Sequence, residues 1–370
     1  MLWGTAAGAG DCVFRRQAGQ ENTIASPRPS GPGRVFSAGL PPDRDRLSPQ
    51  LDLFGQAAEP DPTAKGHSPA ERDARLVDLA GRLPPSVRLG TSSWAFAGWA
   101  GVVYDSPLPA PVLSREGLAT YARHPLLRTV GLDRTFYAPI PEEEYRRLAE
   151  QVPAGFTFLV KAPQAFTAPF NYESREPSAD YLDPVPARDL FVDPCVAGLG
   201  KHAGPLVFQF PPQGRAITRE PGAFAGRLAT FLGKLPRGPL YAVELRDREL
   251  LAPEVMRALE AGGARLCLGV HARMPPVAIQ AAAATALGDG PLVIRWNLHA
   301  GFAYEEAKSR YAPFDRLVDE DPSTRTAIAT LAREACARGD PVWIIANNKA
   351  EGSAPLTLER LARAIVEPGG

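Results

Sequence analysis

Hydrophobic and polar positions alternate in residues 240–246 in a way that is typical of a barrel strand. Neighbouring side chains on a strand point to opposite faces, so Glu244 and Arg246 share one face with Ala242. The opposite face is apolar throughout, whereas this face becomes charged at its C-terminal end. In a barrel of parallel strands, the outward residues pack under helices and functional groups stand at the C-terminal strand ends. The pattern therefore predicts an inner face that ends in a site.

Four more apolar stretches repeat this arrangement. They cover residues 157–161, 206–210, 292–297 and 342–348, and their terminal polar residues are Lys161, Gln209, Arg295, Asn297, Asn347 and Asn348. One polar group at the end of one strand is common where the strand end meets solvent. Five such strands, separated by helical segments, indicate that the polar ends meet at one site.

Strands and helices alternate from Ser68 onward. A first helix is expected at residues 68–83, closed by Pro84-Pro85. Further helices are expected from Ser114 and at residues 187–199, the latter inside a long insertion after the third strand. The predicted strands cover residues 87–91, 129–135, 157–161, 206–210, 240–246, 265–270, 292–297 and 342–346.

Eight strands with helices between them predict an α/β fold of the TIM type, a (β/α)8 barrel over residues 68–370. An open, doubly wound sheet is the alternative. Against that alternative, Thr91-Ser92-Ser93-Trp94 follows the first strand where a dinucleotide-binding fold needs a glycine fingerprint.

Residues 1–67 are rich in Pro, Gly and small polar residues, which predicts a flexible, disordered N-terminal tail. One denser stretch within it, residues 50–55, resembles the short peptide by which bacterial DNA polymerases and repair proteins bind the sliding clamp. Its side chains would fill an apolar groove and supply hydrogen bonds, and they are Gln50, Leu51, Asp52, Leu53 and Phe54. The alternatives are a chance apolar patch and an arm that packs on the barrel.

The composition indicates more about the cellular location of the protein than about its function. Lys plus Arg equals Asp plus Glu, 41 against 41, so no basic excess indicates a nucleic-acid surface. The 4 cysteines are scattered, which argues against a disulfide framework and a structural zinc site. The first 13 residues lack a basic region typical of a signal peptide, and no apolar run is long enough for a membrane span. We expect a cytoplasmic protein.

The polar strand ends include a candidate catalytic pair, Glu244 and Lys161. A carboxylate and an amine in one barrel mouth act as general base and acid if each shifts the pKa of the other toward neutrality. The alternative is that Glu244 pairs with Lys161, Arg246 or Arg295 in a buried network that holds the barrel closed. The two arginines also form a fork suited to a carboxylate- or phosphate-bearing ligand, unless they neutralise Glu244 and Asp133.

Other ligand contacts are expected from Trp94 and Tyr137, whose rings are suited to stack on a base or sugar. The alternative is that these aromatic residues form part of the barrel's cap. Metal ligation would require His, Asp and Glu side chains that converge. Since only Asp133, Glu244, His271 and His299 are available, we expect neither a catalytic metal nor a cofactor.

An ordered series of motifs resembles the YecE-like family, domain of unknown function 72. The series comprises Gly90-Thr91-Ser92-Ser93-Trp94, Gly98-Trp99, Thr135-Phe136-Tyr137, Lys161-Ala162, Phe208-Gln209-Phe210-Pro211-Pro212, Val243-Glu244 with Arg246, and Asn347-Asn348. The resemblance spans nearly all of residues 87–370. It implies a TIM-type barrel, broadly similar to apurinic endonuclease and sugar isomerase barrels, and it implies no particular reaction.

The chain also departs from this family pattern at four places. Gly131 and Asp133 stand where the family usually has Glu and Asn, and Ala168, Asp247 and Asn297 stand where it usually has His. One acid and three histidines are therefore replaced. The changes fit either a specialised branch or a loss of activity.

Two classes of function follow. The first is an enzyme, a metal-independent hydrolase or lyase linked to DNA metabolism, that acts on a phosphate- or carboxylate-bearing substrate. The second is a non-catalytic barrel tethered to the replication or repair machinery by its clamp-binding tail. Turnover that depends on Glu244 would distinguish them.

Overall fold

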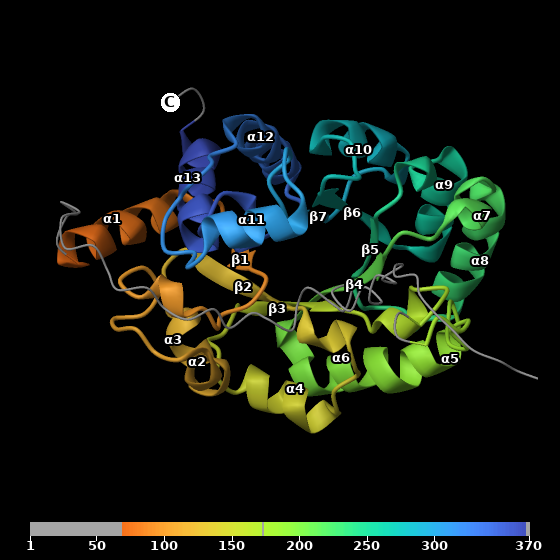
Figure 1. Ribbon diagram of the computed structural model, residues 1–370, viewed down its shortest axis with the longest axis horizontal. Coiled ribbons are helices and arrows are strands. Elements are labelled where there is room, and N and C mark those ends of the chain that lie inside the picture. Colours follow the sequence, from red (N-terminus) through yellow and green to blue (C-terminus); the bar gives the residue numbers. More distant parts are fainter. Residues whose placement is uncertain (1–68, 172–173, 368–370) are drawn as a thin grey trace, which may run out of the picture. The chain divides into compact units, whose positions relative to one another are not determined.

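The eight strands form one closed barrel of parallel strands in sequential order, β1 to β8 (Figure 1). A computed structural model of the chain describes residues 69–171 and 174–367. The strands are β1 (Val87–Thr91), β2 (Leu127–Leu132), β3 (Thr157–Lys161), β4 (Ala203–Phe210), β5 (Tyr241–Leu245), β6 (Arg265–Val270), β7 (Leu292–Trp296) and β8 (Val342–Ala346). The predicted TIM-type barrel is confirmed.

Helices follow the strands and surround the barrel, as Figure 1 shows. The longer ones are α1 (Pro69–Arg82), α4 (Glu142–Ala149), α8 (Pro221–Lys234), α9 (Pro253–Gly262), α11 (Tyr304–Tyr311), α12 (Pro322–Arg338) and α13 (Ala354–Val366). The shorter ones are α2 (Ala110–Glu116), α3 (Leu118–Tyr121), α5 (Pro184–Ala187), α6 (Asp193–Leu199), α7 (Arg215–Thr218) and α10 (Val277–Ala283). The helix expected at residues 68–83 is α1.

The strands alternate between an inner and an outer face, as the pattern of β5 predicts. Inside the barrel, one side chain from each of β3 to β8 forms a small apolar cluster: Leu159, Val207, Ala242, Cys267, Val293 and Ile345. The outward residues join a much larger core with the helices. Two residues further along each of these strands, the inward positions are Lys161, Gln209, Glu244, Gly269, Arg295 and Asn347. An apolar layer therefore lies beneath a polar layer at the C-terminal end of the barrel.

The second strand begins and ends earlier than predicted. It covers Leu127–Leu132, and the expected residues 133–135 turn instead into the 3-10 helix η3 (Arg134–Phe136). The Thr135 hydroxyl donates to the carbonyl oxygens of Leu132, at 2.7 Å, and Lys161, at 2.6 Å, and so closes this turn. Asp133 is consequently the first residue after the strand.

Two helix boundaries also differ from the prediction. The helix expected from Ser114 begins at Ala110 and is divided by Gly117 into α2 and α3. The helix expected at residues 187–199 begins at Pro184, where the Asp183 carboxylate accepts a hydrogen bond from the backbone N–H of Val185. In both cases a proline at or next to the first turn marks the start, because its fixed φ suits that position.

The predicted tail, residues 1–67, and its clamp-binding peptide, residues 50–55, lie outside the described residues. Within residues 69–171 and 174–367, no helix has the length and apolar character needed to cross a membrane.

Candidate functional site at the barrel mouth

Arg295, at the end of β7, lies at the centre of a buried ion-pair cluster. Its Nη1 donates to Glu244 Oε2 of β5 at 2.7 Å. Its Nη2 donates to both carboxylate oxygens of Asp133, just after β2, each at 2.7 Å. The side chains of Arg295 and Glu244 are 2% and 0% exposed, so water screens this pair very little. One guanidinium thus links strands from opposite sides of the barrel.

Glu244 has three partners that together occupy its carboxylate. Besides Arg295, Arg246 Nη2 lies 2.5 Å from Glu244 Oε1, and the Asn297 amide donates to the same oxygen at 3.1 Å. The Gln209 amide oxygen accepts from Arg246 Nη2 at 3.4 Å. Gly269 on β6 leaves room for this arrangement, because a Cβ there would lie 3.2 Å from Glu244 Oε1.

The two arginines keep Glu244 ionised. Burial alone would raise the pKa of this carboxyl, but the attraction of Arg246 and Arg295 outweighs burial and lowers the pKa to about 2. For Arg295, burial opposes the charge, yet Asp133 and Glu244 raise the pKa of the guanidinium above its usual value. Glu244 and Arg295 therefore both favour their charged forms, and each of the two guanidinium groups lies against a carboxylate.

Lys161, at the end of β3, differs from these charged groups. Its side chain is buried, and its Nζ lies 3.6 Å from the centre of the Phe136 ring. In the described part of the chain, no carboxylate oxygen lies within the 4.0 Å of an ion pair with it. Burial lowers the pKa of Lys161 to about 7, and the repulsion of Arg295 and Arg246 opposes the attraction of Asp133 and Glu244. Burial thus makes Lys161 release its proton far more readily than an exposed lysine does.

The expectation that Glu244 and Lys161 shift each other toward neutrality is wrong for both, because Glu244 raises the pKa of Lys161, which burial lowers, and Lys161 lowers the pKa of Glu244. For Glu244 the outcome is also far from neutrality. Its pKa moves away from neutrality because the two arginines act on it more strongly than burial does. The alternative reading, a buried network with Arg246 and Arg295, describes its contacts. Among the two candidates, Lys161 is the group suited to exchange a proton near neutral pH.

A second buried lysine was not identified from the sequence. Lys349 lies in the 3-10 helix η9 (Asn348–Ala350) after β8, and its Nζ lies 4.2 Å from the centre of the Tyr304 ring. Burial, followed by the repulsion of Lys308, lowers its pKa to about 8. The sequence feature that could have identified Lys349 is its position beside Asn347-Asn348 at a strand end. Phe136, whose ring contacts Lys161, was recognised only as part of the motif Thr135-Phe136-Tyr137 and not as a residue of the site, because aromatic residues are common in barrel cores.

Three of the predicted ligand contacts serve the scaffold. The Asn347 amide donates to the Ser92 hydroxyl at 2.8 Å. The Asn348 oxygen accepts from the Trp99 indole at 3.2 Å and from the backbone N–H of Ala354 at 2.9 Å. The Trp94 side chain is buried, and its indole donates to the Leu113 carbonyl at 3.0 Å. In this conformation their polar groups hold together loops around β1 and β8.

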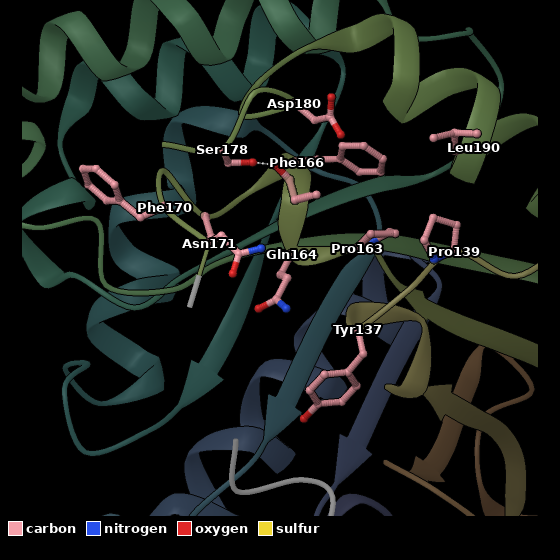
Figure 2. Close-up of a pocket in the computed structure, with 12 residues that line it drawn as sticks. Tyr137, Pro139, Pro163, Gln164, Phe166, Phe170, Asn171, Ser178, Asp180 and Leu190 are labelled. Atoms are coloured by element: carbon pink, nitrogen blue, oxygen red, sulfur yellow. Dashed lines mark hydrogen bonds between the residues drawn. The ribbon is translucent and has the colours of Figure 1, made fainter. Parts of the chain in front are cut away.

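Tyr137 lies beside the barrel mouth and lines a cavity of about 240 Å³, which we call the side cavity (Figure 2). The cavity is formed by the loops after β2 and β3 and by the insertion that follows β3. Its lining comprises Tyr137, Pro139, Pro163, Gln164, Ala165, Phe166, Ala168, Phe170, Asn171, Ser178, Asp180 and Leu190. The Phe136 ring joins the two sites, since it contacts Lys161 and also lies 5.6 Å from the Tyr137 ring, centre to centre.

Metal-binding side chains do not converge in the described part of the chain. There, no group of three or more His, Cys, Asp and Glu side chains is arranged to hold a metal ion. His271, a candidate ligand from the sequence, accepts a hydrogen bond from the backbone N–H of Arg273. Burial and the nearby Arg246 lower its pKa to about 4.

The fold and this cluster define a class: an eight-stranded α/β barrel with a buried polar cluster at its C-terminal mouth. The model of the family described as protein of unknown function DUF72 matches residues 88–369. The chain belongs to this family, as the sequence motifs predicted.

Solved structures share the fold at low sequence identity. Two crystal structures of a DUF72 family protein from Enterococcus faecalis match with TM-scores of 0.54 and 0.51. Their identities are 18% and 16%; each covers 75% of this chain, and the matches cover 95% and 97% of those chains. A DUF72 family protein from Thermotoga maritima has 17% identity and a TM-score of 0.49, with 76% of this chain and 99% of that chain covered. No curated protein matches the sequence.

Proposed function

We propose that the barrel mouth binds a small phosphate- or carboxylate-bearing ligand and that Lys161 acts on it as a general base or nucleophile. The reaction class that fits is hydrolysis or elimination, in which a neutral amine accepts a proton from water or from a carbon next to the leaving group. In this proposal the enzyme acts in DNA metabolism and needs no metal for the proton transfer. Glu244 holds the arginines in place and takes no proton itself.

The observation that carries this proposal is the environment of Lys161. Its amine is buried near two guanidinium groups and has no described carboxylate partner at ion-pair distance. An anion that enters next to Lys161 would supply the missing negative charge. Arg246 and Arg295 add no free charge to this attraction, because Glu244 and Asp133 already pair with their guanidinium groups.

Anion binding is expected to weaken as pH rises, because an anion favours the protonated form of Lys161. Sulfate is a suitable probe, since its own charge does not change between pH 6 and pH 8.5. Titration calorimetry should show binding roughly tenfold weaker at pH 8.5 than at pH 6, with proton uptake at the higher pH. Lys161→Met should bind sulfate weakly at both values. Equal affinity at both pH values in the unchanged protein would refute the proposal.

The second candidate function is recruitment to the sliding clamp through residues 50–54. This proposal rests on the sequence alone: the peptide matches the clamp-binding pattern and lies in a segment otherwise poor in large apolar residues. A short linker to the barrel would hold the barrel near the clamp at about millimolar effective concentration for DNA that passes through it. A barrel site with low affinity for DNA would then be sufficient for the protein to act there.

A peptide that covers residues 49–56 tests this recruitment. It should bind purified bacterial sliding clamp with modest affinity, because a few anchors must offset the ordering of a flexible segment. The control peptide carries Leu53→Ala and Phe54→Ala and should bind at least roughly tenfold more weakly. If both peptides bind equally, or neither binds, the recruitment proposal fails.

A further inference from the structure

Lys161 and the side cavity are linked by one loop of the chain and by the ring of Phe136. Gln164, which lines the cavity, follows Lys161 by three residues in the loop after β3. Phe136 contacts Lys161 on one side and Tyr137, a wall of the cavity, on the other. A ligand with its anionic group beside Lys161 would extend its other end past Phe136 toward this cavity.

The walls of the cavity favour a flat, largely apolar group. Tyr137 and Phe166 contribute aromatic rings. Phe170 and Leu190 are also part of the lining, although their side chains are 53% and 50% exposed. Large apolar side chains that remain exposed around a concave surface commonly mark a binding site. Aromatic rings in particular bind planar ligands by stacking.

The polar groups of the cavity restrict its ligand further. The Gln164 carboxamide is half-buried and makes no hydrogen bond to the described residues. In Figure 2 its side chain extends toward the Tyr137 ring. A carboxamide carries hydrogen-bond donors and an acceptor, so it pairs with the edge of a ring that also carries a donor and an acceptor. Beside an alkyl chain, the Gln164 carboxamide would have no hydrogen-bond partner.

Charge sets the orientation of the ligand. Asp180 is the one charged residue among the described residues that line the cavity. Its carboxylate would repel a phosphate but accept a hydrogen bond from an amino group. The anionic end of a ligand is thus directed to Lys161, and an uncharged ring with an amino group to the side cavity.

We propose that the side cavity binds the amino-substituted base of a nucleotide whose phosphate lies at the barrel mouth. This inference rests on the proposed function for the phosphate end and adds the substrate class, a nucleotide or a nucleotide unit of a nucleic-acid strand. Gln164 recognises the edge of the base, and Asp180 accepts from its amino group.

Titration calorimetry of the full chain with three probes tests the inference. The probes are AMP, ribose 5-phosphate, which lacks the base, and adenosine, which lacks the phosphate. AMP should bind roughly tenfold or more tightly than ribose 5-phosphate, because a stacked base contributes on this scale. Gln164→Leu and Phe170→Ala should reduce this preference and leave ribose 5-phosphate binding unchanged. The matched control is Gln151→Leu, on the turn after α4 and outside the cavity lining, and it should change neither affinity.

The outcomes separate this inference from the proposed function. Equal binding of AMP and ribose 5-phosphate overturns the base site and leaves the anion site intact. Binding of adenosine without binding of ribose 5-phosphate supports the base site and contradicts the anion site. Tighter AMP binding by Gln164→Leu would show that the cavity takes an apolar group instead of a base. If none of the probes binds, both assignments fail.

Discussion

Replacing Glu244 by alanine is expected to destabilise the protein by about 3–5 kcal/mol, a cost typical of removing one partner of a buried ion pair. The carboxylate is 0% exposed and accepts from three side chains. Without it, Arg246 and Arg295 keep their charges inside the barrel with Asp133 as the remaining nearby carboxylate. The large effect thus comes from two buried guanidinium groups that are left with one carboxylate, Asp133, which contacts Arg295 alone.

Urea unfolding at pH 7 measures this cost. The matched control is Glu249→Ala, because the Glu249 side chain is 53% exposed and its carboxylate lies 3.7 Å from Arg248, whose side chain is 75% exposed. Exposed pairs of this sort contribute about 0–1 kcal/mol. A Glu244→Ala variant as stable as Glu249→Ala would show that the Glu244 carboxylate is hydrated and that no buried network closes the barrel.

Replacing Lys161 by methionine is expected to stabilise the protein, and most strongly below pH 7. Burial depresses the folded-state pKa to about 7 from 10.5. Between these two values the unfolded chain holds a proton that the folded chain has released, so the stability of the unchanged protein rises with pH. Below pH 7 the buried ammonium exerts its full penalty, on the order of 5 kcal/mol at about 1.36 kcal/mol per tenfold change in proton affinity.

The difference in unfolding free energy between Lys161→Met and the unchanged protein should therefore be large at pH 6 and small at pH 10. Methionine keeps the length and much of the volume of lysine, so the cavity term stays small. Lys201→Met, at an exposed lysine, serves as the control and should show little change at either pH. A destabilised Lys161→Met variant at pH 6 would mean that the charged ammonium is well accommodated.

The barrel could be predicted from the sequence because the alternation of side chains on each strand is a local property. The bounds of β1, β3, β6 and β8 follow from it directly. The end of β2 could not be predicted in this way, because Thr135 is a residue type that is common in strands. Its hydroxyl instead bonds two backbone carbonyls, one of them on β3, and such a contact is not visible in the pattern of a single segment.

The position of the site was predictable from the sequence, but the roles of its residues were less predictable. Lys161, Glu244 and Arg295 were expected at the mouth because each ends an apolar strand. Which of them titrates near neutrality depends on contacts between strands far apart in the chain. Arg295 of β7 reaches Glu244 of β5 and Asp133 after β2, whereas Lys161 lies against Phe136. These distances decide the pKa values, and the sequence does not contain them.

The most direct measurement is the pKa of Lys161 itself, because the proposed chemistry depends on an amine that is partly neutral at physiological pH. Lysine labelled with 13C at Cε gives one NMR signal per lysine, and the signal lost in Lys161→Met identifies the residue. We expect this signal to titrate with a midpoint near pH 7, while exposed lysines titrate near pH 10.4. A midpoint at or above pH 10 would contradict the account.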